Sequence, residues 1–266
     1  MNVLIAAVLG LVQGLCEFLP ISSSGHLLLM EKIFGITDGG YFFTVLLHLG
    51  TLAAVLFVYR KRIIEMILHP VQQYKYWLWM IVATVVTLGV KLVFDKLFDE
   101  AEDGRVLGLC FLLTSALLLL CTLLRNKLGG KNTIPTMKWY HAVGIGLMQG
   151  IAILPGVSRS GATITGATAC RLKRDEAAEF SFLLSIPAIL GGAVLEIPKA
   201  IREGTANVGV LSCIVGLIVA AVSGYFAVRF MIRLITKRSL NGFAIYTAAL
   251  GVFVILDKFV FHMIKW

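Results

Sequence analysis

Most of this chain consists of apolar stretches that are long enough to cross a lipid bilayer. Six of them are expected to be membrane-spanning helices, at residues 41–58, 76–94, 106–124, 178–195, 208–228 and 240–256. A helix needs roughly 20 apolar residues to cross the hydrocarbon core. Hydrophobic residues make up 58% of the sequence and the mean hydropathy is +0.89, far outside the usual range of soluble proteins. The sequence therefore predicts an all-α polytopic membrane protein.

The basic residues lie in short clusters between these stretches. The clusters fall at residues 60–62, 125–138, 171–174 and 229–238, and the formal net charge is +9. Lysine and arginine gather in the cytoplasmic loops of membrane proteins, so these clusters are expected inside and the loops at 95–105 and 196–207 outside. Membrane topology explains this charge better than a nucleic-acid surface does, and no nucleic-acid partner is expected.

A polar segment interrupts the apolar sequence near the N-terminus. Residues 13–26 read Q-G-L-C-E-F-L-P-I-S-S-S-G-H. Gln13 and Glu17 are four residues apart, which places both side chains on one helix face. Pro20 disfavours further regular helix, and Gly25 is free to take a positive φ, so a turn and a second short helix at 26–34 are expected. Hydroxyls and backbone N–H groups at such a turn suit a phosphate; the alternative is a turn in which the serines only cap the helix.

The chain contains an internal repeat. Without gaps, Gly10, Gln13, Gly14, Ser22, Ser24 and Gly25 match Gly146, Gln149, Gly150, Ser158, Ser160 and Gly161. We divide the single membrane domain into repeat halves at 1–130 and 131–266, each a re-entrant helical hairpin followed by three transmembrane helices. An odd number of spans gives the halves opposite orientations, the inverted-topology repeat of many transporters, in which the hairpins meet near the midplane. The paired glycines at small-x-x-x-small spacing are expected to pack the hairpins together.

The two copies differ where polar chemistry would be placed. Glu17, Ser23 and His26 of the first copy correspond to Ile153, Arg159 and Ala162 of the second. One half thus supplies an acid, a hydroxyl and an imidazole, and the other a fixed cation suited to a bidentate grip on phosphate. The alternatives are an interfacial Arg159 that reaches for water and a buried His26 that only satisfies its hydrogen bonds. His48, within an apolar span, is interpreted as a residue without a catalytic role.

The two motifs together resemble those of the undecaprenyl-diphosphate phosphatases, the bacitracin-resistance family. The resemblance rests on residues 13–26 and on P-G-V-S-R-S-G-A-T at 155–163, and the spans between them fit in number and order. It implies a multi-pass enzyme of the bacterial cell membrane that hydrolyses undecaprenyl diphosphate to the monophosphate and recycles this lipid carrier for peptidoglycan synthesis. The active site would face outward. The family implies catalytic roles for Glu17, Ser23, His26 and Arg159.

The sequence leaves the details of the chemistry open. Ser23 would attack the phosphorus or position the attacking water, and a His26 nucleophile is a further alternative. Glu17 would orient His26 or, with Gln13, help to bind a divalent cation, Mg²⁺ or Ca²⁺; some members carry glutamate in place of Gln13, so a site that needs two carboxylates would be one ligand short here. The expected phosphate-binding residues, at the two turns, are Ser22, Ser24, Gly25, Ser158, Ser160, Gly161 and Thr163.

A different class of function remains open from the residues. Inverted repeats with opposed hairpins are typical of transporters, so a lipid-phosphate transporter or flippase is the alternative to the phosphatase. A carrier has less need of an acid, a hydroxyl and an imidazole confined to one half. The expected partners are the polyprenyl diphosphate substrate, membrane lipids and a second copy of the chain in a homodimer.

Overall fold

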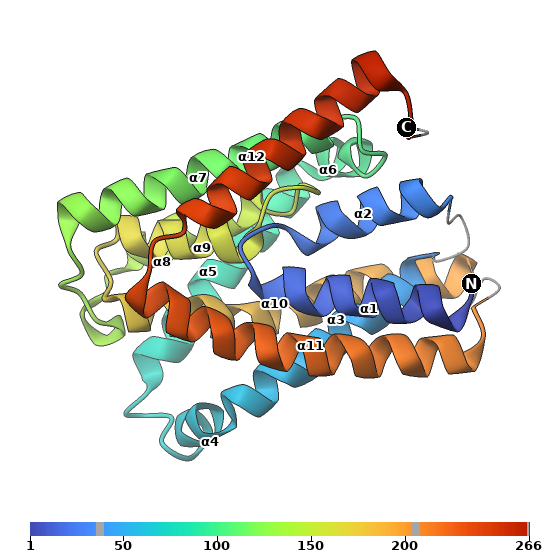
Figure 1. The fold of residues 1–266 in the computed structure, drawn as a ribbon. Helices are drawn as coiled ribbons and strands as arrows, with labels where there is room; N and C mark the ends of the chain where they lie inside the picture. The colour runs from blue at the N-terminus through green and yellow to red at the C-terminus, as the bar shows by residue number, and fades with distance from the viewer. Residues whose placement is uncertain (36–39, 204–207, 265) are drawn as a thin grey trace.

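The computed structural model describes residues 1–35, 40–203, 208–264 and 266, and its described part is helical with no β-strand (Figure 1). The helices are α1 (Val3–Phe18), α2 (Ser23–Phe34), α3 (Gly40–Val58), α4 (Arg60–Leu68), α5 (Tyr74–Val93), α6 (Asp95–Ala101), α7 (Leu107–Leu128), α8 (Trp139–Ile151), α9 (Arg159–Ala169), α10 (Arg174–Glu203), α11 (Val210–Lys237) and α12 (Asn241–Leu256). Within these described residues, five helices are long and apolar enough to span a membrane, or six with the bent pair α3 and α4. The predicted all-α polytopic class is confirmed.

Several element boundaries differ from the predictions. Helix α10 continues to Glu203, so much of the loop predicted at 196–207 is helical, and residues 204–207 lie outside the described residues. The loop predicted at 95–105 contains α6. Helix α2 begins at Ser23 rather than His26, because the Ser22 side chain caps it by accepting a hydrogen bond from the Gly25 N–H. The positive φ expected at Gly25 belongs instead to Ser22, at 70°.

The first helix of each hairpin packs against the middle span of the other predicted half. Helix α1 lies along α11, and α8 lies along α5. Other contacts between long helices also join the two halves, with α3 against α11 and α10, and α7 against α12; Figure 1 shows the α1–α11 and α7–α12 pairs side by side. The two halves are thus packed together as one body. Their opposite orientation in a membrane stays a prediction.

The paired glycines make these contacts close, but their partners are not the ones expected. A Cβ added at Gly10 would lie 2.5 Å from the carbonyl oxygen of Gly216 in α11, and one at Gly146 would lie 2.6 Å from that of Ala83 in α5. The glycines therefore bring each hairpin against a spanning helix of the other half, not the two hairpins against each other. The reason is that α11 and α5 supply the small residues and bare backbone that a close helix approach requires.

Replacing Gly10 with alanine should destabilise the fold by ~1–3 kcal/mol, since the new methyl group would overlap backbone atoms that cannot move without displacing α11. The matched control is Gly144→Ala in α8, where a Cβ would meet no atom within 4 Å and alanine is a better helix former. Thermal unfolding of both variants in the same detergent tests this. Equal melting temperatures for the two variants would show that the α1–α11 contact adapts to the added atom.

Candidate functional site

The two polar turns are in contact with each other. The Ser22 hydroxyl accepts hydrogen bonds from the backbone N–H of Gly25 in its own turn, at 3.3 Å, and of Gly156 in the other turn, at 3.1 Å. A side chain at Gly25 would not fit, because its Cβ would lie 2.7 Å from the Cα of Gly156. Gly156 itself has a φ of 94°, which favours glycine. The predicted meeting of the two turns is therefore confirmed.

Glu17 is the centre of the polar cluster at these turns. Its Oε1 accepts a hydrogen bond from Arg159 Nη2 at 2.8 Å, an ion pair between the two halves of the chain. Its Oε2 accepts from Ser23 Oγ at 2.5 Å and from Gln13 Nε2 at 3.0 Å. The carboxylate is buried, and a buried charge needs such partners. The predicted proximity of Gln13, Glu17, Ser23 and Arg159 is found.

Two buried polar atoms of this cluster have no partner in the part of the chain that the structure describes. They are Nη1 of Arg159 and the side-chain oxygen Oε1 of Gln13. A buried donor or acceptor without a partner costs about 1–3 kcal/mol, so such atoms are uncommon unless a ligand satisfies them. Arg159 Nη1 is the atom that would complete a bidentate contact with an anion while Nη2 remains on Glu17.

His26 forms its hydrogen bonds with residues other than the predicted partner, Glu17. Its Nδ1 lies 2.7 Å from the carbonyl oxygen of Ser22, and its Nε2 lies 2.7 Å from the hydroxyl of Tyr246 in α12. Since a carbonyl can only accept, Nδ1 carries the proton, and Nε2 of the neutral ring accepts from Tyr246. The two rings are also stacked, with centroids 5.7 Å apart. The interpretation that Glu17 orients His26 is therefore wrong in this structure.

Tyr246 was not predicted at the site, and His48 was interpreted as a residue without a catalytic role. Nε2 of His48, in α3, lies 3.8 Å from Oε2 of Glu17, which places this imidazole at the cluster rather than apart from it. One signal was available. Continued along the chain, the repeat comparison sets His48 against Leu184 and Tyr246 against Cys110, the same kind of polar difference that singled out His26.

The other predicted phosphate-binding residues divide into two groups. Ser158 caps α9 by accepting from the Gly161 N–H at 3.1 Å, and the Thr163 hydroxyl turns away to Ser181 in α10, at 2.6 Å. These two hydroxyls serve the fold. Ser24 is half-buried, with its Oγ 3.3 Å from that of Ser22, and Ser160 contacts the turn through a 3.4 Å hydrogen bond to the carbonyl oxygen of Leu19. Ser24 keeps hydrogen-bonding capacity for a ligand, whereas the buried Ser160 hydroxyl is shared between Leu19 and Ser158 Oγ, the latter at 3.2 Å.

The cluster offers limited donors for a divalent cation. No group of three or more His, Cys, Asp or Glu side chains is arranged to hold a metal among the described residues. The unpaired, buried Oε1 of Gln13 is an oxygen ligand of the kind that Mg²⁺ and Ca²⁺ prefer, and it belongs to the amide group whose Nε2 donates to the Glu17 carboxylate. These two residues fit a cation that takes its remaining ligands from water and from the oxygens of a bound phosphate.

Comparison with known proteins places this architecture in a family. The family described as bacitracin resistance protein BacA matches residues 6–253. An undecaprenyl-diphosphatase of Carboxydothermus hydrogenoformans is 44% identical over 262 residues, which cover 96% of this chain and 97% of the relative. Corresponding proteins are 40% identical over 269 residues in Alkaliphilus metalliredigens, covering 94% and 97% of the two chains, and 38% identical over 260 residues in Bacillus cereus, covering 97% and 98%. This chain therefore belongs to the BacA family of bacitracin resistance proteins.

Proposed function

We propose that this protein is an integral membrane phosphatase that hydrolyses undecaprenyl diphosphate to undecaprenyl phosphate and inorganic phosphate. The observation that carries the proposal is the buried, unpaired Nη1 of Arg159 beside a serine hydroxyl that is hydrogen-bonded to a carboxylate. Membership of the BacA family and the activity for which its relatives are named support the same substrate. The product would return to cell-wall synthesis as a lipid carrier.

The terminal phosphate would bind where the two turns meet. Arg159 Nη1 would hold one of its oxygens, and the Ser24 hydroxyl offers a further donor. Phosphoryl transfer depends mainly on positioning and on neutralising charge, which a buried guanidinium supplies without reorganisation. The polyprenyl tail would remain in the lipid, and the site would open to the outer face of the bacterial membrane, as the distribution of basic clusters predicts.

Ser23 is the best-placed nucleophile. Glu17 accepts its hydrogen bond at 2.5 Å and would take its proton as Oγ attacks the terminal phosphorus. The bond from that phosphorus to the bridging oxygen would break, undecaprenyl phosphate would leave, and water would then release inorganic phosphate from the serine. His26 is less suited to attack, because both of its ring nitrogens are already hydrogen-bonded. Its role would be to assist the leaving group together with Tyr246.

A divalent cation would be held by Gln13 and Glu17 together with the substrate. When bound, it would neutralise negative charge on the diphosphate. Gln13 has the unpaired oxygen for this contact, whereas both oxygens of Glu17 already accept hydrogen bonds from the protein.

The decisive experiment is phosphate release from undecaprenyl diphosphate by the purified protein in detergent, with added Mg²⁺ or Ca²⁺ and with EDTA. We expect release by the wild-type protein and its loss with EDTA. Activity that survives EDTA would reject the cation proposal but not the phosphatase. If a well-folded protein releases no phosphate in any of these conditions but carries the lipid across vesicle membranes, the transporter or flippase alternative holds.

Tyr246→Phe is expected to lower the kcat of phosphate release by about tenfold, because His26 Nε2 loses the hydroxyl that now fixes the ring. The pH dependence of kcat should also change, since His26 Nε2 could then accept a proton from a donor other than Tyr246. A loss of packing alone would leave this pH dependence unchanged. Tyr74→Phe removes an exposed hydroxyl in α5 and serves as the control. Equal rates and profiles for the two variants would remove Tyr246 from the mechanism.

A further inference from the structure

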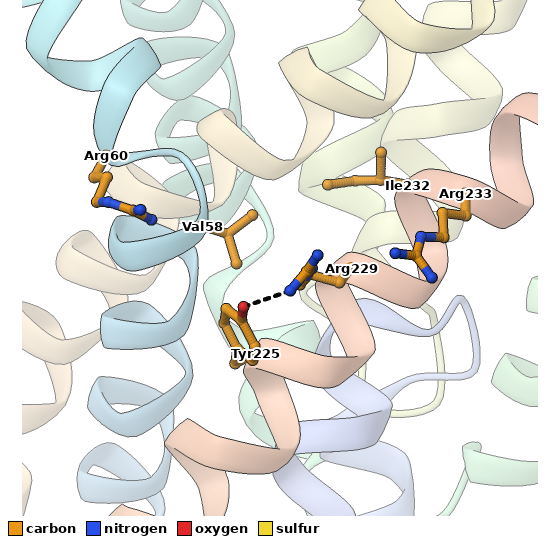
Figure 2. Close-up of a pocket in the computed structure, with 6 residues that line it drawn as sticks. All are labelled: Val58, Arg60, Tyr225, Arg229, Ile232 and Arg233. Carbon is orange, nitrogen blue, oxygen red and sulfur yellow. Dashed lines mark hydrogen bonds between the residues drawn. The ribbon is translucent and has the colours of Figure 1, made fainter.

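A cavity lies away from the two turns, between the end of α3 and the carboxyl-terminal half of α11. Its volume is about 380 Å³, and it is lined by Val58, Arg60, Tyr225, Arg229, Ile232 and Arg233. Figure 2 shows Arg60 on one side and the two arginines of α11, on successive turns, on the other. None of these residues takes part in the proposed phosphatase chemistry. Three arginines around one cavity call for a separate explanation.

The charge of this arginine pocket is not balanced by the protein. Among the described residues, no aspartate or glutamate forms an ion pair with Arg60, Arg229 or Arg233, and the nearby Glu65 and Glu179 pair with Arg62 instead. Three guanidinium groups around one cavity repel one another, and the positive electrostatic potential inside the cavity favours an anion. The arginine pocket is therefore suited to a ligand that brings negative charge.

Two of the arginines are also held in place by their own neighbours. Arg229 Nη1 donates to the Tyr225 hydroxyl at 2.7 Å, as Figure 2 shows, and Arg60 Nη1 donates to the carbonyl oxygen of Phe57 at 2.9 Å. Each of these bonds fixes the side chain but leaves other N–H groups of the guanidinium free. Planar guanidinium groups that are held in this way present N–H donors that match the oxygens of a phosphate group.

The surroundings of the arginine pocket place it at the level of lipid headgroups. The chain bends by 71° between α3 and α4. Helix α4 exposes Ile64, Ile67 and Leu68 while its first turn is basic, the pattern of a helix that lies in the membrane interface. Phe57 and Phe226, which lie next to lining residues in the chain, are 57% and 63% exposed. Tyr225, which contacts both of these rings and lines the cavity, is of the residue type that is enriched at the lipid–water boundary.

We infer that the arginine pocket binds the phosphate headgroup of an anionic phospholipid of the cytoplasmic leaflet. The three arginines would contact the phosphate, and Val58 and Ile232 would contact the glycerol end of the acyl chains, which continue along the exposed aromatic side chains into the bilayer. The ligand is assigned to the lipid rather than to free phosphate because half of the lining is apolar or aromatic and lies beside the lipid-facing surface. The inference does not depend on the phosphatase activity.

The test is lipid retention by the delipidated, full-length protein, measured by native mass spectrometry with phosphatidylglycerol and, separately, with zwitterionic phosphatidylcholine. The pocket variant is Arg229→Gln with Arg233→Gln. The control, Lys237→Gln with Arg238→Gln, removes the same charge from the same end of α11 outside the cavity. We expect the wild type and the control to prefer phosphatidylglycerol, and the pocket variant to bind it about tenfold more weakly. Phosphate release in detergent should be the same in all three.

Three results would overturn the inference. They are equal retention of phosphatidylglycerol by the pocket variant and the control, equal retention of phosphatidylcholine and phosphatidylglycerol by the wild type, and displacement of the lipid by inorganic phosphate at the same concentration, which would identify a site for the free anion. If the double variant does not fold, Arg60→Gln removes a contact from the opposite wall and is judged by the same criteria.

Discussion

Replacing Arg159 with lysine is expected to lower phosphate release from undecaprenyl diphosphate by about 100-fold or more. A lysine ammonium can approach Glu17, but it cannot keep that contact and present a second, coplanar N–H to a phosphate as Arg159 does. Removing one preorganised donor from a developing charge typically costs about 10²–10³ in rate. Kinetics of phosphate release by purified wild type and variant measure the effect, with the loss expected in kcat rather than in KM alone.

The lysine variant is preferable to alanine for a physical reason. Arg159→Ala would leave Glu17 buried and unpaired, which costs about 3–5 kcal/mol of stability and confuses unfolding with catalysis. The control is Arg125→Lys, since Arg125 in α7 also has a buried, unpartnered Nη1 within the described structure but lies away from the polar turns. Wild-type rates for Arg159→Lys would show that a point charge is sufficient, and the bidentate contact would have to be abandoned.

Ser23→Ala should reduce phosphate release by roughly 10³-fold or more, as expected when the nucleophile is removed from a group of catalytic residues that act together. The fold should tolerate the change, because only one hydroxyl is lost and Glu17 keeps Arg159 and Gln13 as partners. A second readout is the covalent intermediate: acid quenching with substrate labelled in the terminal phosphate should leave label on the wild-type protein and none on the variant.

This variant also separates the alternatives that the sequence left open. The comparison is Ser24→Ala, which removes a half-buried hydroxyl of the same turn without a bond to Glu17; it should cost only about tenfold, the loss of one neutral hydrogen bond to the phosphate. If Ser23→Ala loses less than tenfold and the wild type retains no label, water attacks the phosphorus directly and Ser23 only positions it.

The sequence was sufficient for the part of the site that is encoded locally or by the repeat. Gln13 and Glu17 share a face because helical spacing fixes it, and the structure joins them at 3.0 Å. Arg159 was predicted near Glu17 only because two copies of one motif imply two facing turns. Their 2.8 Å ion pair across the halves agrees with that argument. Both results depend on short-range geometry or on symmetry.

Helical spacing and the internal repeat could not predict contacts between positions that are far apart in the sequence and not related by the repeat. Tyr246 reaches His26 across 220 positions of sequence, and the repeat comparison marks it only as a polar difference, without indicating which residue it contacts. His48 was set aside for the same reason. The glycines were correctly taken as sites of close approach, but a pattern of small residues does not name its partner, and Gly10 meets α11.

The exchange of helices between the halves affects the order in which the protein can be assembled. Helix α1 ends at Phe18, whereas α11, against which it packs, begins at Val210 and follows Arg159, the counterion of Glu17. At a synthesis rate of about 5–20 residues per second, the ribosome makes α1 some 10–40 s before its partner emerges. Until then the amino-terminal hairpin, with its carboxylate, lacks the helix and the counterion that it contacts in the final fold. The segment that is translated first would be among the last to reach its final depth in the bilayer.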